Sequence, residues 1–228
     1  MLQNLYLSIC KIIYGEFSEK YFFLVEDYKK RYPALNVTLK KCFKTDEILK
    51  FDGIIIRKNS VPVYKTLQPI QMEEIKFGSD IKDIVGYKGK TTCANYVKLG
   101  EDTVQIIGYH ERILNASARL NFFAIDGKYF FGEYHFSKYD KTRNIQIAKT
   151  IQKKYGIEKS NDEPNFYIED EQGSILYFCD DGFSLSIKYF TPAYCNSYHQ
   201  LQTLFNGKVA GDQTQTDELL KIKFESKL

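Results

Sequence analysis

Tryptophan is absent from this sequence, and methionine occurs only twice in 228 residues. Large side chains come instead from 18 tyrosines and 17 phenylalanines, and aromatic residues make up 15% of the chain. Aromatic residues favour β-strands and bury large areas. A core without Trp and with little Met has to be filled by Tyr and Phe, so the composition predicts a sheet-centred fold.

An excess of charge of one sign is also lacking, since the formal net charge is only +3. A near-neutral chain has no strong field to attract nucleic acid or acidic membranes. Arginine, which grips phosphate bidentately, is scarce among the positive residues. We therefore expect no nucleic-acid partner. RNA binding by aromatic residues of a sheet stays an alternative, and its only support in the sequence is Lys128 beside Tyr129.

A hydrophobic run long enough to span a bilayer is missing as well. The apolar segment Leu2–Ile13 is too short, and it has neither the basic region nor the cleavage site of a signal peptide. Its apolar residues repeat at helical spacing, which predicts an amphipathic surface helix. We expect no membrane association. A secreted or anchored protein is the alternative if the true start lies upstream.

Paired cysteine motifs are absent. The five cysteines, which show neither a CxxC pair nor metal-ligand spacing, are Cys10, Cys42, Cys93, Cys179 and Cys195. An odd count without such spacing predicts reduced thiols and a cytoplasmic protein. Cys93 and Cys179 are most simply interpreted as core residues.

Catalytic and cofactor motifs are lacking too. The sequence contains no HExxH, no zinc-type Cys/His spacing and no GxSxG. Residues 89–92 (GKTT) match the last residues of a phosphate-binding loop motif, but Ile84 occupies the position where that motif requires its first glycine. We expect neither a metal nor a cofactor, and the sequence favours a non-catalytic protein over an enzyme.

What the sequence does contain is a clear succession of helical and strand patterns. It predicts helices at 2–13 and 19–32, with Ser18 as N-cap and Pro33 ending the second helix. The elements expected after these are a strand at 51–57, a helix at 80–85 capped by Ser79, strands at 96–99 and 103–113, a hairpin at 118–136, a helix at 140–155, strands at 165–169, 174–179 and 183–190, and a helix at 193–205.

This order predicts an α+β fold in which helices pack on one face of an antiparallel sheet. We expect residues 1–70 to form an N-terminal helical extension or small subdomain, 71–206 the α+β sheet domain, and 207–228 a polar, flexible tail. The firmest element is the aromatic hairpin Ala118–Phe136, because Asp126-Gly127 is a strong two-residue turn signal.

The segment FGSDIKDIV (Phe77–Val85), followed by Gly86 and Lys90, resembles the entry segment of small outer-membrane-lipoprotein A and β-lactamase-inhibitor-like modules. In that family a glycine and a short helix precede a curved antiparallel sheet, and the members act by binding proteins. The resemblance therefore implies a protein-binding module. It covers only residues 77–90, and the family's lipoprotein cysteine and the proline after the glycine are absent.

Glu133 and His135 are the catalytic candidates. Side chains alternate along a strand, so these two residues project from the same face of the second hairpin strand. They could couple as base and orienter, or bind a metal with His110 or Glu111 of a neighbouring strand. The simpler interpretation, which we favour, is a Glu and a His on the wet face of a half-buried sheet.

Aromatic side chains on adjacent strands are the binding candidates. They are Tyr109, Tyr129, Phe131, Tyr134, Tyr167, Tyr177 and Tyr189, with Tyr129 and Phe131 expected on the face of Glu133. Tyrosine gives a large contact area at low entropy cost, which suits interfaces, although core filling is the simpler interpretation in a chain without Trp. We predict a non-catalytic protein-binding module of immunity, inhibitor or scaffold type that uses this aromatic sheet face on another protein. The alternative is an enzyme or small-ligand-binding protein with a pocket around Glu133, His135 and Tyr109.

Overall fold

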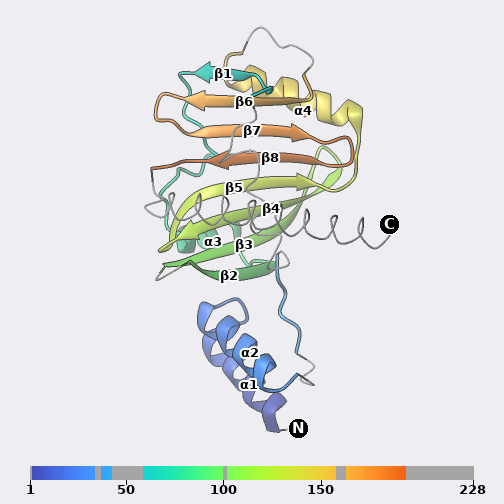
Figure 1. Ribbon diagram of the computed structural model, residues 1–228. Coiled ribbons are helices and arrows are strands. Elements are labelled where there is room, and N and C mark those ends of the chain that lie inside the picture. The colour runs from blue at the N-terminus through green and yellow to red at the C-terminus, as the bar shows by residue number, and fades with distance from the viewer. Residues whose placement is uncertain (1, 34–36, 43–58, 100–101, 158–162, 194–228) are drawn as a thin grey trace, which may run out of the picture. The chain divides into compact units, whose positions relative to one another are not determined.

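The computed structural model describes residues 2–33, 37–42, 59–99, 102–157 and 163–193. These residues form four helices and one eight-stranded sheet (Figure 1). The helices are α1 (Leu2–Tyr14), α2 (Glu19–Arg31), α3 (Ile81–Lys88) and α4 (Lys141–Lys154). The strands are β1 (Val63–Thr66), β2 (Cys93–Leu99), β3 (Asp102–Ile113), β4 (Ala116–Ile125), β5 (Lys128–Phe136), β6 (Asn165–Asp170), β7 (Ile175–Asp180) and β8 (Leu185–Phe190). The strand expected at 51–57, the helix expected from 193 onward and the tail from 207 lie outside the described residues, apart from residue 193.

The eight strands lie in the order β1-β6-β7-β8-β5-β4-β3-β2. Strands β2 to β5 form one antiparallel meander, strands β6 to β8 form a second, and β5 pairs with β8 where the two meet. The expected α+β class is confirmed, and the sheet, which was expected to be antiparallel, is mostly so. The sheet is nevertheless mixed, because β1 pairs parallel to β6.

Strand β1 lies in a segment for which the sequence predicted no element. Its only local signals are Pro62 and Pro69, on either side of the strand. Pro62 stands just before the strand, where the ladder needs no donor from it. Its carbonyl accepts a hydrogen bond from the backbone N of Tyr167 at 2.8 Å, and Val63 then pairs with Tyr167. The partner strand, β6, is about 100 residues away in the chain, so no local sequence pattern predicts this pairing.

Local turns and caps largely follow the sequence signals. Asp126 and Gly127 both adopt positive φ, 50° and 76°, as a two-residue turn between twisted strands requires. The hydroxyl of Ser18 caps α2 by accepting a backbone N–H at 3.2 Å. The cap of α3 is Asp80 instead of the predicted Ser79, because the carboxylate of Asp80 reaches the first turn at 2.8 Å.

A β-bulge interrupts the β4–β5 ladder between Phe123 and Ala124. Phe131 pairs with Phe123, whereas Tyr129 pairs with Ala124, the next residue along β4. Successive residues of a strand point to opposite faces, so the bulge turns Tyr129 away from the face of Phe131. The prediction that these two aromatic residues share a face is therefore wrong.

One buried cluster joins two helices to the sheet. Its helical members are Ile81 and Ile84 of α3 and Ile147 and Ile151 of α4. Strand side chains of the same cluster include Tyr109, Leu120, Phe122, Tyr129, Phe166 and Leu176. We call the face of the sheet that carries these strand residues the cluster face, and the other the opposite face.

Helices α1 and α2 form a hairpin with a small core of its own. That core consists of Leu7, Cys10, Tyr21 and Val25. The hairpin meets the edge strand β2 through Phe22, whose ring centroid lies 5.4 Å from that of Tyr96. The hydroxyl of Tyr96 donates to the carbonyl of Phe17 at 2.5 Å, so a polar bond accompanies this aromatic contact.

Candidate functional site

The seven aromatic residues predicted to form a contact surface are largely interior. Six of them, each 7% exposed or less, are Tyr109, Tyr129, Phe131, Tyr167, Tyr177 and Tyr189. Tyr134 is half-buried and packs edge-on against Tyr189. Phe131, Tyr167 and Tyr177 lie on the opposite face and the other four on the cluster face. The set therefore fills space in a chain without Trp and does not form one exposed patch.

Glu133 and His135 lie on the same face of β5, as the alternation of the strand predicts. They pair across the ladder with Asn121 and Arg119 of β4. The buried Glu133 carboxylate accepts a hydrogen bond from the amide nitrogen of Asn121 at 3.4 Å. Nδ1 of His135 lies 3.1 Å from the hydroxyl oxygen of Ser186. Burial lowers the pKa of His135, which favours its neutral form at pH 7.

The third groups proposed for this pair lie elsewhere. Tyr109 and Glu111 are on the cluster face of β3, where Tyr109 pairs with Leu120, and Glu133 is on the opposite face. The pocket predicted around Glu133 and Tyr109 is therefore not formed. His110 shares the face of Glu133, but β4 separates their strands. Among the described residues, no group of three or more His, Cys, Asp or Glu side chains could hold a metal ion.

A disulfide between Cys42 and Cys93 holds the segment 37–42 to β2. The backbone N of Cys42 donates to Oδ1 of Asn95 at 2.6 Å, and its carbonyl accepts from the guanidinium of Arg119 at 3.3 Å. The prediction of reduced thiols is wrong for this pair, and the inference of a cytoplasmic location loses that premise. The free cysteines of the described residues are Cys10 and Cys179.

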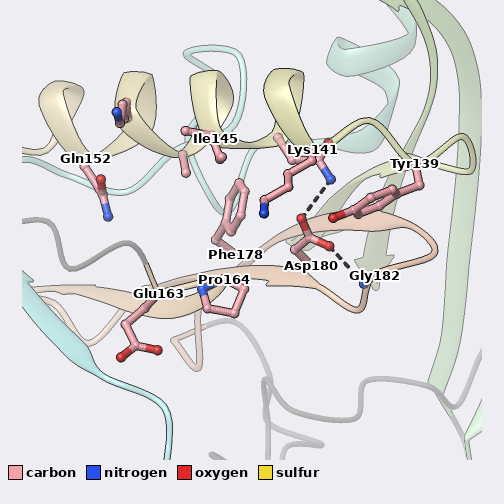
Figure 2. Close-up of a pocket in the computed structure, with 12 residues that line it drawn as sticks. Tyr139, Lys141, Ile145, Gln152, Glu163, Pro164, Phe178, Asp180 and Gly182 are labelled. Atoms are coloured by element: carbon pink, nitrogen blue, oxygen red, sulfur yellow. Dashed lines mark hydrogen bonds between the residues drawn. The ribbon is translucent and has the colours of Figure 1, made fainter.

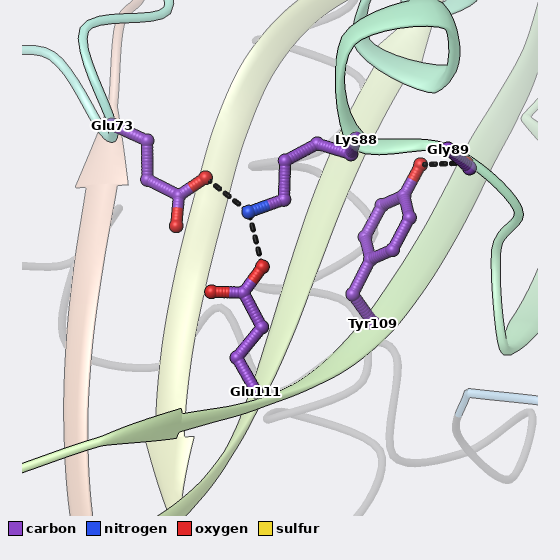
Figure 3. Close-up of polar contacts among 5 residues, drawn as sticks. All are labelled: Glu73, Lys88, Gly89, Tyr109 and Glu111. Atoms are coloured by element: carbon purple, nitrogen blue, oxygen red, sulfur yellow. Dashed lines mark hydrogen bonds and ion pairs between the residues drawn. The ribbon is translucent and has the colours of Figure 1, made fainter.

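An ion cluster ties α3 to the sheet (Figure 3). Nζ of Lys88, at the end of α3, lies 2.6 Å from Oε2 of Glu73 and also contacts Oε1 of Glu111 on β3. Burial alone would lower the pKa of Lys88, but its bonds to Glu111 and Glu73 outweigh burial and raise it. Beside it, burial raises the pKa of Tyr109 to about 12, and the Tyr109 hydroxyl donates to the Gly89 carbonyl at 3.3 Å. A lysine held charged by two carboxylates serves as a structural cation and is a poor nucleophile.

Replacing Lys88 with methionine is expected to destabilise the protein by about 2 kcal/mol at pH 7, because two partly buried carboxylates lose their shared cation. The folded-state pKa of Lys88 is raised above the unfolded value of 10.5, so its contribution is complete below that pH and is lost as pH rises through the folded pKa. Urea denaturation of both proteins at pH 7 and at alkaline pH measures the difference. Lys82→Met, at an exposed position of α3, is the control. A difference between wild type and Lys88→Met that stays constant into the alkaline range would contradict this assignment.

A groove of about 600 Å³ lies between α4 and β7 (Figure 2). Its apolar lining includes Ile145 and Ala148 of α4, Phe178 of β7 and Pro164. Figure 2 shows the ring of Phe178 rising from the sheet toward the helix. The size falls within the range of pockets that bury a ligand.

The polar lining of the groove is held in place on one side and unpartnered on the other. Asn144 and Gln152 of α4 are only 1% and 3% exposed. The Asp180 carboxylate accepts from the Asn144 side chain and from the backbone N of Gly182, both at 2.9 Å. Oε1 of Gln152 is buried and has no hydrogen-bond partner in the part of the chain that the structure describes. A buried acceptor without a donor costs free energy.

The α4 wall of the groove is basic. The helix, KTRNIQIAKTIQKK, carries five cationic side chains and no acidic one. Lys141 and Lys149 line the groove and are exposed, and Glu163 lies at the other end from Lys141 (Figure 2). Two large apolar residues of the lining, Tyr139 and Ile145, are 45% and 42% exposed. Basic and apolar surface are thus side by side.

The groove was not predicted from the sequence, since the apolar period of α4 alone would place Ile145 on the inward side of the helix with Ile147 and Ile151. The structure leaves Ile145 exposed and buries Asn144 and Gln152 instead. These two amides are eight positions apart and share one side of α4. No signal in the sequence marks these two amides as buried, because their burial depends on where β7 lies against α4.

Comparisons with known proteins found no matching family model, no matching curated protein and no matching solved structure. The resemblance of residues 77–90 to inhibitor-like modules thus rests on those residues alone. None of the helices described here is long and apolar enough to cross a bilayer.

Proposed function

We propose that this protein is a non-catalytic binding protein that takes an acidic segment of another protein into the groove between α4 and β7. The observation that carries the proposal is an open, partly apolar groove whose α4 wall presents two exposed lysines, Lys141 and Lys149, and no acidic side chain. Complementary charge guides encounter and orients a partner, while apolar side chains supply contact area.

Single groups in the groove support an ordered mode of binding. Lys141 and Lys149 would pair with acidic side chains of the partner, and Tyr139 and Ile145 would receive an apolar one. The anionic groups of the partner would thus lie along α4, away from Glu163.

The proposal keeps the partner class expected from the sequence and moves the site from the aromatic sheet face to the groove. It agrees with the protein-binding role implied by the resemblance of residues 77–90. Packing of α3 and α4 on one face of the sheet, supported by their shared buried cluster, would leave the groove at the α4 side. The proposal applies in the cytoplasm as well as in an oxidising compartment, because no cysteine of the described residues lines the groove.

Selection from a displayed library of random short peptides tests this function. We expect enrichment of acidic peptides with an apolar residue, and affinity that falls as salt is raised. The double variant Lys141→Glu/Lys149→Glu is expected to weaken the selected peptides at least about tenfold, a loss of about 1.4 kcal/mol. The matched control reverses two exposed lysines outside the groove, Lys82→Glu/Lys128→Glu, and should bind as the wild type does.

Three outcomes would count against the proposal. They are enrichment of neutral or basic peptides, binding that is indifferent to the groove reversal, and no enrichment at all. A thermal-shift screen tests the alternative of a small-ligand site. That alternative would be favoured if a small molecule stabilises the wild type, if Ala148→Phe, which fills the groove, abolishes this stabilisation, and if no peptide binds.

A further inference from the structure

The outer side of α1 carries apolar side chains that are exposed in the part of the chain that the structure describes. Leu5, Ile9 and Ile12 are 59%, 47% and 84% exposed, and Ile13 beside them is 67% exposed. Residues three and four positions apart are neighbours on a helix, so these four side chains form one continuous surface, the α1 strip. The small core of the hairpin lies on another side of the same helix.

A surface helix usually has a single apolar side, which faces its core. Helix α1 has that side, which packs against α2, and the α1 strip in addition. The strip runs from Leu5 to Ile13, about 13 Å along a helix of 13 residues. Contiguous exposed apolar surface of this kind marks an interaction site.

The charge of α1 indicates the kind of partner. Lys11 is the one charged side chain in the helix, and it pairs with Glu16 at 3.0 Å. Helices that lie on a lipid surface carry many Lys and Arg residues on their polar face, and α1 does not. Contact surfaces between identical chains are more apolar than other interfaces and poor in charge. The strip has that composition.

We propose that the α1 strip is a self-association surface, on which the strip of a second copy packs about a two-fold axis. A two-fold contact joins the same patch on both copies, so it has to be self-complementary, and an uncharged apolar strip meets that condition. A strip about 13 Å long buries less than the roughly 800 Å² per partner of standard interfaces, so the dimer is weak. This surface is separate from the groove.

Sedimentation velocity of the full chain over a concentration series tests the proposal. The average mass of the wild type is expected to rise toward that of a dimer. Ile12→Glu raises the dissociation constant at least about tenfold, because a charge would be buried in an apolar contact. The matched control is Leu67→Glu, outside the hairpin and 83% exposed against 84% for Ile12, and it dimerises as the wild type does.

Two results would overturn the proposal, namely a wild type that stays monomeric throughout and an Ile12→Glu variant that dimerises normally. Vesicles of mixed neutral and anionic lipids provide the competing probe. A monomeric wild type that binds these vesicles through Ile12 would assign the strip to a lipid surface instead. Lys141→Glu/Lys149→Glu is expected to leave the dimer unchanged, which separates this proposal from the proposed function of the groove.

Discussion

Converting Cys42 and Cys93 to serine together is expected to lower the free energy of unfolding by about 4 kcal/mol. The disulfide closes a loop between residues 51 positions apart, and removing it restores that conformational freedom to the unfolded chain. The folded chain keeps the bonds from Cys42 to Asn95 and Arg119, which involve only backbone atoms of Cys42. The loss therefore arises mainly in the unfolded state.

Urea denaturation with and without reductant measures the contribution of the disulfide. Reductant should lower the midpoint of the wild type and leave the double serine variant unchanged. Cys179→Ser, at a free and half-buried cysteine, is the control and should change stability by less than about 1 kcal/mol. If reductant does not change the urea midpoint of the wild type, the Cys42–Cys93 disulfide is refuted. Full stability is thus expected only where thiols stay oxidised.

Replacing Gly108 with alanine is expected to cost about 3 kcal/mol, because the new methyl group has no room. A Cβ at Gly108 would lie 2.8 Å from Sγ of Cys42, still closer to Sγ of Cys93 and 3.1 Å from Oδ1 of Asn121. The two sulfurs are joined, so neither can rotate away. The variant should therefore unfold at clearly lower urea than the wild type.

Gly86→Ala is the matched control for Gly108→Ala. No atom lies within 4 Å of a Cβ at Gly86, which sits within α3, so alanine there should stabilise by roughly 0.5–1 kcal/mol. In the Cys42→Ser/Cys93→Ser background, the cost of Gly108→Ala should shrink, since the unlinked side chains can rotate. If Gly108→Ala lowers the free energy of unfolding equally in both backgrounds, the disulfide is not the reason why position 108 requires glycine.

Elements with a local signal were predictable. The hairpin of β4 and β5 follows from its Asp126-Gly127 turn, and α4 from its apolar period and its Asp140 cap. Phe183 shows the limit of pattern reading. It continues the alternation of β8, yet it is 83% exposed, because its backbone N bonds to the carboxylate of Asp181 in the preceding turn.

Features that depend on distant partners were not predictable. The parallel pairing of β1, the Cys42–Cys93 bond and the bulge at Phe123 each join or shift segments without a mark in the local sequence. The same holds for the groove, because burial of Gln152 depends on where β7 lies against α4. Composition predicted abundant buried tyrosine, but only the strand order shows which face each ring occupies.

The central position of β5 has a consequence for synthesis. In chain order β5 ends the first meander, and its second neighbour, β8, begins only at Leu185. For roughly 3 to 10 seconds of translation β5 is therefore a bare sheet edge. Its sequence, KYFFGEYHF, is rich in aromatic residues, and such edges pair readily with other chains. We therefore expect slower translation between Phe136 and Leu185 to lower the yield of folded protein.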